Sequence, residues 1–208
     1  MKIYRRMHER FGPQGWWPGD SPFEVAIGAI LTQNTSWDNV EKAIGNLKGA
    51  RRLSFSRMHS LSQRQLSRLI RPAGYYNIKA RRLKNFLDFL NKEYQGRLEN
   101  MRSKDIVFLR RQLLSVNGIG PETADSVLLY ALDKPIFVID AYTRRIFSRH
   151  HLLKEDSDYQ DIQDFFMRHL SPQGKLFNEY HALLVKCAKE FCRKSKAHCR
   201  ECPLEEKK

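Results

Sequence analysis

Four cysteines near the end of the sequence have a spacing that suits metal binding. Cys187, Cys192, Cys199 and Cys202 lie within 16 residues of one another. A disulfide framework usually spreads its cysteines through a small secreted chain. The opening stretch MKIYRRMHERFG is too charged for a signal peptide. Because clustered thiolates are ligands for zinc and for iron–sulfur clusters, we expect a metal site here.

One carboxylate, Asp140, stands between the apolar run Ile136–Ile139 and a following helical pattern. An ionised carboxylate can stabilise a positive charge that develops nearby or orient a water for attack. An aspartate that precedes a helix is also a common N-cap, and the residue types alone favour the cap.

Gly118 and Gly120 enclose Ile119 between two helical patterns, and Pro121 suits the first turn of the second helix. Such a turn presents the backbone N–H groups of Gly118, Ile119 and Gly120 at a helix N-terminus, where they can meet a phosphate oxygen. The alternative is a plain corner between two helices.

The composition favours an anionic partner. The chain has 208 residues, with 37 Lys and Arg against 23 Asp and Glu, and therefore a net charge of +14. Such an excess most often serves nucleic-acid binding, although some soluble proteins are simply basic. With 41% hydrophobic residues the chain can bury a core. No apolar run is long enough to span a membrane.

Helical patterns must position these residues almost throughout. Ser21 begins a capping box before an apolar helix, Ser36 begins another helix, and Ser62 repeats the capping-box pattern. Ile136–Ile139 is an isolated β-type run, and one strand cannot form a sheet. We therefore predict an all-α protein. The other expected helices cover 3–11, 79–94, 103–115, 121–132, 141–149, 156–170 and 176–192.

Four segments, in order, resemble those of the endonuclease III superfamily of helix-hairpin-helix DNA glycosylases. They are Leu31-Thr32-Gln33-Asn34-Thr35, Gly74-Tyr75-Tyr76-Asn77-Ile78-Lys79-Ala80, Leu113–Asp125 and Val138–Arg145. With the cysteines, they cover nearly the whole chain. The resemblance implies a two-lobed all-α fold with DNA in a cleft between lobes of residues 20–134 and of residues 1–19 plus 135–208.

The resemblance also assigns roles to residues. Asp140 becomes the catalytic aspartate, and Gln33 or Asn34 becomes the wedge that fills the space of a flipped base, because the alignment slips by one residue there. We expect DNA contacts at the hairpin, where the resemblance also suggests a monovalent cation. The hairpin residues are Gly118, Ile119, Gly120 and Thr123.

Glu122 and the tryptophans point to one branch of the family. Bifunctional members carry a Schiff-base lysine at the position of Glu122. We therefore predict a monofunctional glycosylase. Trp16, Trp17 and Trp37 resemble the base pocket of the 3-methyladenine branch, where aromatic rings select a cationic alkylated purine by cation–π attraction. Core packing is the commoner role of tryptophan.

The cysteines match the family's [4Fe–4S] motif, Cys-x6-Cys-x2-Cys-x5-Cys, in part. Cys192, Cys199 and Cys202 take the first three positions, and the fourth falls on Lys208. Cys187 is the candidate substitute ligand. A packed tail without a cluster is the alternative. The expected role is structural, because a cluster would hold a basic loop against DNA.

The sequence thus predicts an enzyme of base excision repair that flips and hydrolytically removes a damaged, alkylated purine from double-stranded DNA. The alternatives are a bifunctional enzyme on oxidised pyrimidines, a mismatch glycosylase and a non-catalytic lesion-binding module. We expect a monomer in the cytoplasm, at the nucleoid if the source is prokaryotic. We expect a basic run to form mainly a solvated helix face, with phosphate contacts as the alternative. That run is Arg71, Lys79, Arg81, Arg82 and Lys84.

Overall fold

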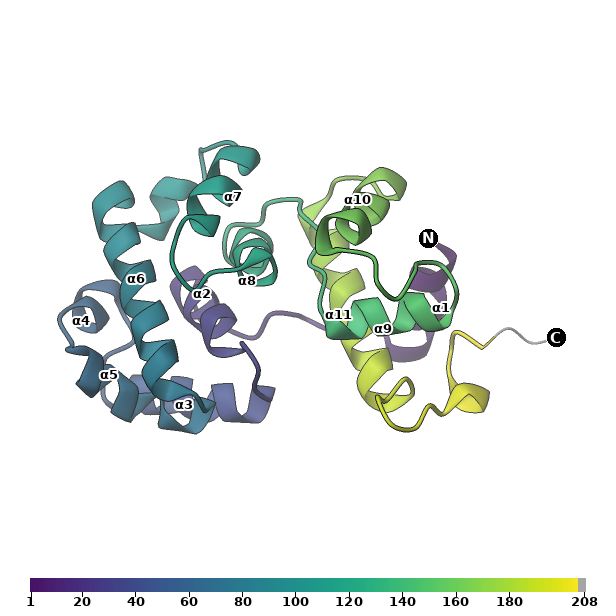
Figure 1. The fold of residues 1–208 in the computed structure, drawn as a ribbon, viewed down its shortest axis with the longest axis horizontal. Helices are drawn as coiled ribbons and strands as arrows, with labels where there is room; N and C mark the ends of the chain where they lie inside the picture. The colour runs from purple at the N-terminus through teal and green to yellow at the C-terminus, as the bar shows by residue number, and fades with distance from the viewer. Residues whose placement is uncertain (206–208) are drawn as a thin grey trace. The chain divides into compact units, whose positions relative to one another are not determined.

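The computed structural model describes residues 1–205, and this part of the chain is helical without any strand-paired sheet (Figure 1). The chain divides into two compact units. Unit 1 comprises residues 1–17 and 133–208, and unit 2 comprises residues 18–132. Both borders lie two residues before the expected ones.

Unit 2 is built around a buried central helix, α2, whose residues 24–31 are all buried. Helix α2 packs against η3, α6, α3 and α8, as expected for a helix that is apolar nearly all round. Helices α4 and α5 pack on α6, and α7 packs on α8. The elements of unit 2 are α2 Pro22–Leu31, α3 Trp37–Gly49, α4 Phe55–His59, α5 Gln63–Leu69, η1 Arg71–Ala73, α6 Tyr76–Tyr94, η2 Leu98–Met101, α7 Ile106–Leu114, α8 Pro121–Ser126 and η3 Val127–Ala131.

Unit 1 joins the two ends of the chain around one long helix, α11. Helices α1 and α9 both pack on α11. The ring of Phe137 stacks on Phe166 of α10 with centroids 3.9 Å apart, so aromatic packing joins α10 to the same core. The elements of unit 1 are α1 Lys2–Phe11, α9 Ala141–Arg149, α10 Tyr159–His169, α11 Gly174–Glu190 and η4 Cys199–Glu201.

Local capping fixes several helix starts at the expected residues. The Ser21 hydroxyl accepts from the Glu24 amide, and Ser62 with Gln65 forms the complete capping box. The run Ile136–Ile139 is buried and extended but has no strand partner in the described residues. No helix within residues 1–205 is long and apolar enough to cross a membrane.

Candidate active site

Asp140 is the N-cap of α9, at the end of the extended run Ile136–Ile139. Its Oδ1 accepts from the Thr143 amide at 2.7 Å, which satisfies a backbone donor of the first helical turn. The cap role that the residue types favoured is therefore real. One carboxylate oxygen serves the helix, and Oδ2 remains for other chemistry.

The second oxygen of Asp140 faces a histidine. His181 Nε2, on α11, lies 3.4 Å from Asp140 Oδ2, and the two side chains are 6% and 12% exposed. Burial raises the pKa of Asp140, but the nearby His181 charge and hydrogen bonds from His181 and Thr143 outweigh it, so the pKa lies below its usual range. At neutral pH the site thus holds an ionised carboxylate.

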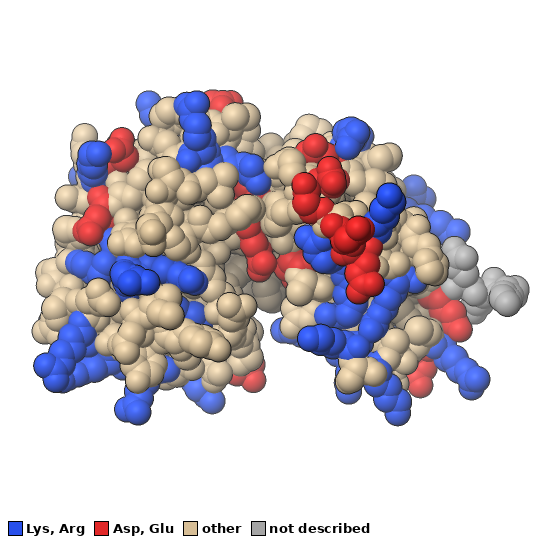
Figure 2. All heavy atoms as spheres, viewed as in Figure 1, with Lys and Arg blue, Asp and Glu red and all other residues tan. Residues whose placement is uncertain are grey.

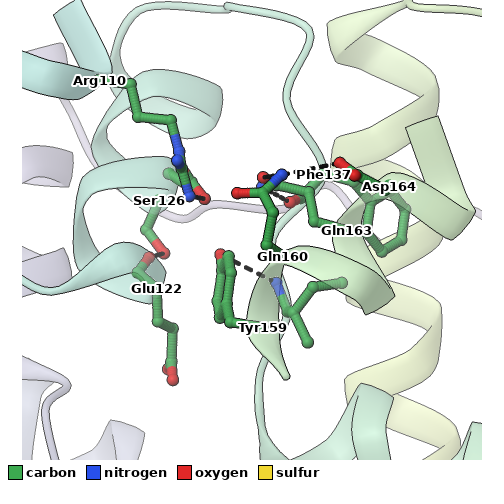
Figure 3. Close-up of polar contacts among 10 residues, drawn as sticks. Arg110, Glu122, Ser126, Phe137, Tyr159, Gln160, Gln163 and Asp164 are labelled. Atoms are coloured by element: carbon green, nitrogen blue, oxygen red, sulfur yellow. Dashed lines mark hydrogen bonds and ion pairs between the residues drawn. The ribbon is translucent and has the colours of Figure 1, made fainter. Parts of the chain in front are cut away.

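Helix α10 fixes the segment that leads to Asp140, as Figure 3 shows. The Tyr159 hydroxyl accepts from the Ile139 amide at 3.3 Å, and Gln163 Nε2 donates to the Phe137 carbonyl at 2.7 Å. These side chains satisfy backbone groups that a sheet would otherwise pair. An extended run without a partner strand can therefore hold a carboxylate in one place.

In unit 2, Gln33 is tied to the hairpin and to α6. Its Nε2 donates to the Gly118 carbonyl at 3.0 Å and to Thr123 Oγ1 at 2.9 Å, while its Oε1 accepts from Arg82 Nη1 at 2.5 Å. Thr123 is buried, so its hydroxyl holds Gln33 rather than facing solvent. The two candidate wedge residues therefore differ. Asn34 is exposed and has φ +53°, in the left-handed region.

The hairpin departs from its expected form at one amide. The Ile119 N–H donates to the Val116 carbonyl at 3.0 Å, so it is used inside the turn and does not serve a phosphate. Within residues 1–205, the Gly118 and Gly120 amides have no such internal acceptor. Ile119 itself is buried, as a residue that joins two helices should be.

Glu122 lies in the first turn of α8, where a negative charge suits the positive end of the helix. Its backbone carbonyl accepts from the Ser126 hydroxyl at 2.7 Å (Figure 3). At the position where the resemblance places the Schiff-base lysine of bifunctional enzymes, this chain has an exposed carboxylate.

The three tryptophans are divided between the units. The rings of Trp16 and Trp17 meet edge to face with centroids 5.4 Å apart, and both residues are half-buried. They belong to unit 1, whereas Trp37 begins α3 in unit 2. The structure thus brings together the first two members of the predicted base pocket.

The four cysteines line one cavity of about 90 Å³ in unit 1. All four are free thiols, with Cys187 Sγ and Cys202 Sγ 3.9 Å apart. As placed, no three His, Cys, Asp or Glu side chains within residues 1–205 could hold one metal ion. The donor chemistry and the shared cavity suit a cluster, but the sulfur positions do not form a ligand set. Lys208 lies outside the described residues.

Only part of the basic run is the solvated face that we expected, since Arg71 and Arg81 are exposed but Lys79 is buried. Lys79 is 1% exposed, and its Nζ donates to the Leu31 and Ala73 carbonyls at 2.8 and 2.7 Å. Lys84 donates to the His59 carbonyl at 2.7 Å, and Arg82 holds Gln33. Lys79 and Lys84 thus satisfy backbone carbonyls, and Arg82 holds the side chain of Gln33 in the wedge segment.

Figure 2 shows Lys and Arg side chains in bands on this face of each unit, with Asp and Glu in smaller groups. The excess of positive charge is thus spread over both units. This distribution agrees with contact along a polyanion by more than one element.

Sequence reasoning missed His181. It lies in an otherwise apolar stretch of α11, where a histidine among buried residues is the available signal. Its partner Asp140 is 41 residues away in the chain, so no local pattern connects them.

A family model described as HhH-GPD superfamily base excision DNA repair protein matches residues 27–172. A protein of Methanocaldococcus jannaschii, named as a DNA repair glycosylase, is 49% identical over 207 residues, which are 99% of this chain and 93% of that protein.

Two solved structures share the fold. The H. pylori 3-methyladenine DNA glycosylase bound to 1,N6-ethenoadenine has a TM-score of 0.80 and 29% identity, over 91% of this chain and 96% of that chain. A non-covalent endonuclease III–DNA complex has a TM-score of 0.83 and 21% identity, over 97% and 90% of the two chains.

Proposed function

Because the chain belongs to the HhH-GPD superfamily of base excision DNA repair proteins, and is a DNA glycosylase, we propose that it is a monofunctional one that excises an alkylated purine. The observation that carries the proposal is the ionised carboxylate of Asp140 together with a carboxylate, Glu122, at the position of the Schiff-base lysine.

The reaction replaces the bond between the sugar C1′ and the base nitrogen by a bond from C1′ to a water oxygen. The base leaves with the electron pair of the broken bond, and a proton of the water is released. Asp140 stabilises the cationic sugar through its negative charge and orients the water through Oδ2, since Oδ1 caps α9. The product is an abasic site.

Glu122 supports the monofunctional assignment. A lyase reaction of this family needs an amine that forms a Schiff base with the sugar, and a carboxylate cannot form one. Strand cleavage at the abasic site then needs alkali or another enzyme.

The substrate class rests on the tryptophans and on one relative. Alkylation puts positive charge on a purine, and the Trp16–Trp17 pair offers aromatic faces that attract a cation. The H. pylori enzyme, named for 3-methyladenine, was solved bound to the modified adenine 1,N6-ethenoadenine. An enzyme on oxidised pyrimidines, a mismatch glycosylase and a lesion-binding module are the alternatives for the test.

DNA is the proposed partner because solved relatives of the same fold are DNA complexes. Excision requires that the target base leave the stack. We propose Asn34 as the wedge, since it is exposed at the tip of the segment whereas Gln33 is held by three hydrogen bonds.

We further propose that the cysteines hold a structural [4Fe–4S] cluster with Cys187 as the fourth ligand. The support is the single cavity that all four line. Protein purified without oxygen should absorb visible light and contain iron and sulfide. Cys187→Ser should lose both, whereas Lys208→Ala should keep them. Colourless, iron-free wild-type protein would refute the proposal.

The test of the reaction is a panel of duplexes that carry 3-methyladenine, 7-methylguanine, hypoxanthine, an oxidised pyrimidine or a mismatch, each with and without alkali. We expect alkali-dependent breaks at the alkylated purines. Breaks without alkali would contradict the monofunctional assignment, and excision confined to the oxidised pyrimidine or the mismatch would contradict the substrate class.

Asp140→Asn tests the carboxylate. Asparagine caps helices about as well as aspartate, so α9 should persist. We expect the single-turnover excision rate to fall by roughly 100-fold or more. Binding to an abasic-site duplex should stay within about threefold, because the variant keeps its fold. Excision at the wild-type rate would remove Asp140 from the chemistry.

A further inference from the structure

A buried histidine stands beside the proposed catalytic carboxylate, and nothing in the hydrolysis described above uses it. His181 comes from the middle of α11, so it is fixed by the helix that forms the core of unit 1. Its Nε2 lies 3.4 Å from Asp140 Oδ2, with both side chains largely buried. The ring also packs edge-on against Phe137, with centroids 6.5 Å apart at 80°.

The two oxygens of Asp140 have different partners. The Thr143 amide holds Oδ1 from α9, and His181 approaches Oδ2 from α11. The hydrogen bond to Oδ1 and the imidazole beside Oδ2 restrict rotation of the carboxylate, and each oxygen keeps a free lone pair. Oδ2 can therefore accept from His181 and still face a sugar or a water.

We propose that His181 is a positioning residue for Asp140, which fixes the direction of Oδ2 and keeps the carboxylate ionised during base excision. The inference rests on the proposed function for its catalytic part. With a proton on Nε2, the imidazole donates to Oδ2, and when protonated at both nitrogens it adds an opposite charge at short range.

The 3.4 Å between His181 Nε2 and Asp140 Oδ2 is short enough for direct electrostatic attraction between the two side chains. The pKa of Asp140 lies below its ordinary value, as expected for a carboxylate beside this histidine. Attraction to His181 and hydrogen bonding lower the pKa of Asp140 against the effect of burial.

Two variants separate positioning from packing. His181→Phe keeps a ring against Phe137 but removes the donor, and His181→Gln keeps an N–H near the position of Nε2. We expect His181→Phe to lower the single-turnover excision rate roughly tenfold, the usual effect of losing one hydrogen bond to a charged group. His181→Gln should recover most of that rate, and affinity for an abasic-site duplex should stay within about twofold in both, because neither variant removes a DNA contact.

A measurement that needs no activity completes the test. In protein labelled with ¹³C at aspartate Cγ, the Asp140 resonance is identified by its loss in Asp140→Asn. Its pKa should rise in His181→Phe, because the favourable charge and donor are gone.

The matched control is His59→Phe. His59 Nε2 lies 2.9 Å from Asp88 Oδ1 in an exposed pair of unit 2, so the same substitution should leave both the Asp140 titration and the excision rate unchanged. An unaltered Asp140 pKa in a folded His181→Phe, or a rate that Gln does not recover, would overturn the inference. If the wild-type protein excises no base from any duplex, the proposed function fails, while the titration still decides whether His181 controls Asp140.

Discussion

Lys79 lies where a charged side chain is costly, since it is almost fully buried. Its Nζ closes the carboxyl end of α2 at Leu31 and the end of η1 at Ala73. A cation suits the C-terminus of a helix, because carbonyl groups there have no intrahelical partner. Lys79 therefore fixes the point at which the chain leaves α2 for the wedge segment.

Lys79→Met should destabilise unit 2. The substitution keeps the apolar stem but leaves two buried carbonyls without a donor, at a cost of about 1 kcal/mol or more for each. We expect urea unfolding at pH 7 to show a free energy of unfolding lower by about 2 kcal/mol. An unchanged midpoint would mean that water replaces the ammonium group.

The same residue gives the protein a defined pH dependence. Burial, with the nearby Arg82 charge, lowers the pKa of Lys79 to about 8 from 10.5. Between these values the folded state binds fewer protons than the unfolded state, so the contribution of Lys79 to the free energy of unfolding rises with pH. The stability difference between wild type and Lys79→Met should widen from pH 8 to pH 10.

Lys48 supplies the control of opposite sign. Hydrogen bonds that this exposed lysine donates to the Asp20 and Glu24 carboxylates raise its pKa. Its contribution to stability is therefore present at low pH and is lost as pH rises through its folded pKa. The difference between wild type and Lys48→Met should stay level from pH 8 to pH 10, so a widening in both variants would refute the assignment to Lys79.

The hairpin shows, at the scale of an element, why its two glycines are not equivalent. Gly118 has φ +94°, and a Cβ there would overlap the Arg82 side chain. Gly120 has φ −93° and open space at the corresponding point. Only the first position requires the absence of a side chain.

Gly118→Ala should therefore cost stability where Gly120→Ala does not. The left-handed backbone costs about 1–2 kcal/mol for alanine, and the displaced Arg82 adds the loss of its bond to Gln33. Gly120→Ala should lie within about 0.5 kcal/mol of wild type, since nothing obstructs it. Thermal unfolding of both variants checks this difference, and equal losses would contradict it.

Elements set by local signals were predictable from the sequence. Ser21 and Ser62 mark helix starts through bonds to amides three residues ahead, and the long apolar helix α2 is buried as its composition indicates. The N-cap role of Asp140 was predictable because a cap is local. Its catalytic role stays a prediction that rests on the order of the motifs in the chain.

Contacts between distant residues were not predictable. Gln33 meets Thr123 across 90 positions and Arg82 across 49, and His181 meets Asp140 across 41. The hydrophobic periodicity of a sequence reveals helix faces but does not show which distant residues will meet. The expected solvent exposure of Lys79 was wrong for a similar reason. A charged residue on an amphipathic helix is usually solvated, but here the carbonyls at two helix ends accept hydrogen bonds from its ammonium group.

At the scale of the whole molecule, we expect the net charge of +14 to drive association with DNA. Each phosphate that a cation neutralises releases counterions. The logarithm of the binding constant therefore falls linearly with the logarithm of the salt concentration, with a slope of about −0.9 for each phosphate contact. Fluorescence anisotropy with an undamaged duplex should show roughly tenfold or greater weakening from 50 to 200 mM salt. An affinity independent of salt would contradict charge-driven binding.

The division of the chain also sets an order of folding during synthesis. Unit 2 is one continuous stretch, residues 18–132, and all of its helices are synthesised before α9. Helix α1 emerges first but packs on α11, near the other end of the chain. Since domains generally fold as they emerge, α1 stays without its partner until synthesis is nearly finished. The carboxylate and its histidine are therefore synthesised last, and we expect a nascent chain that carries the proposed DNA-contacting hairpin to lack the excision site until α11 is made.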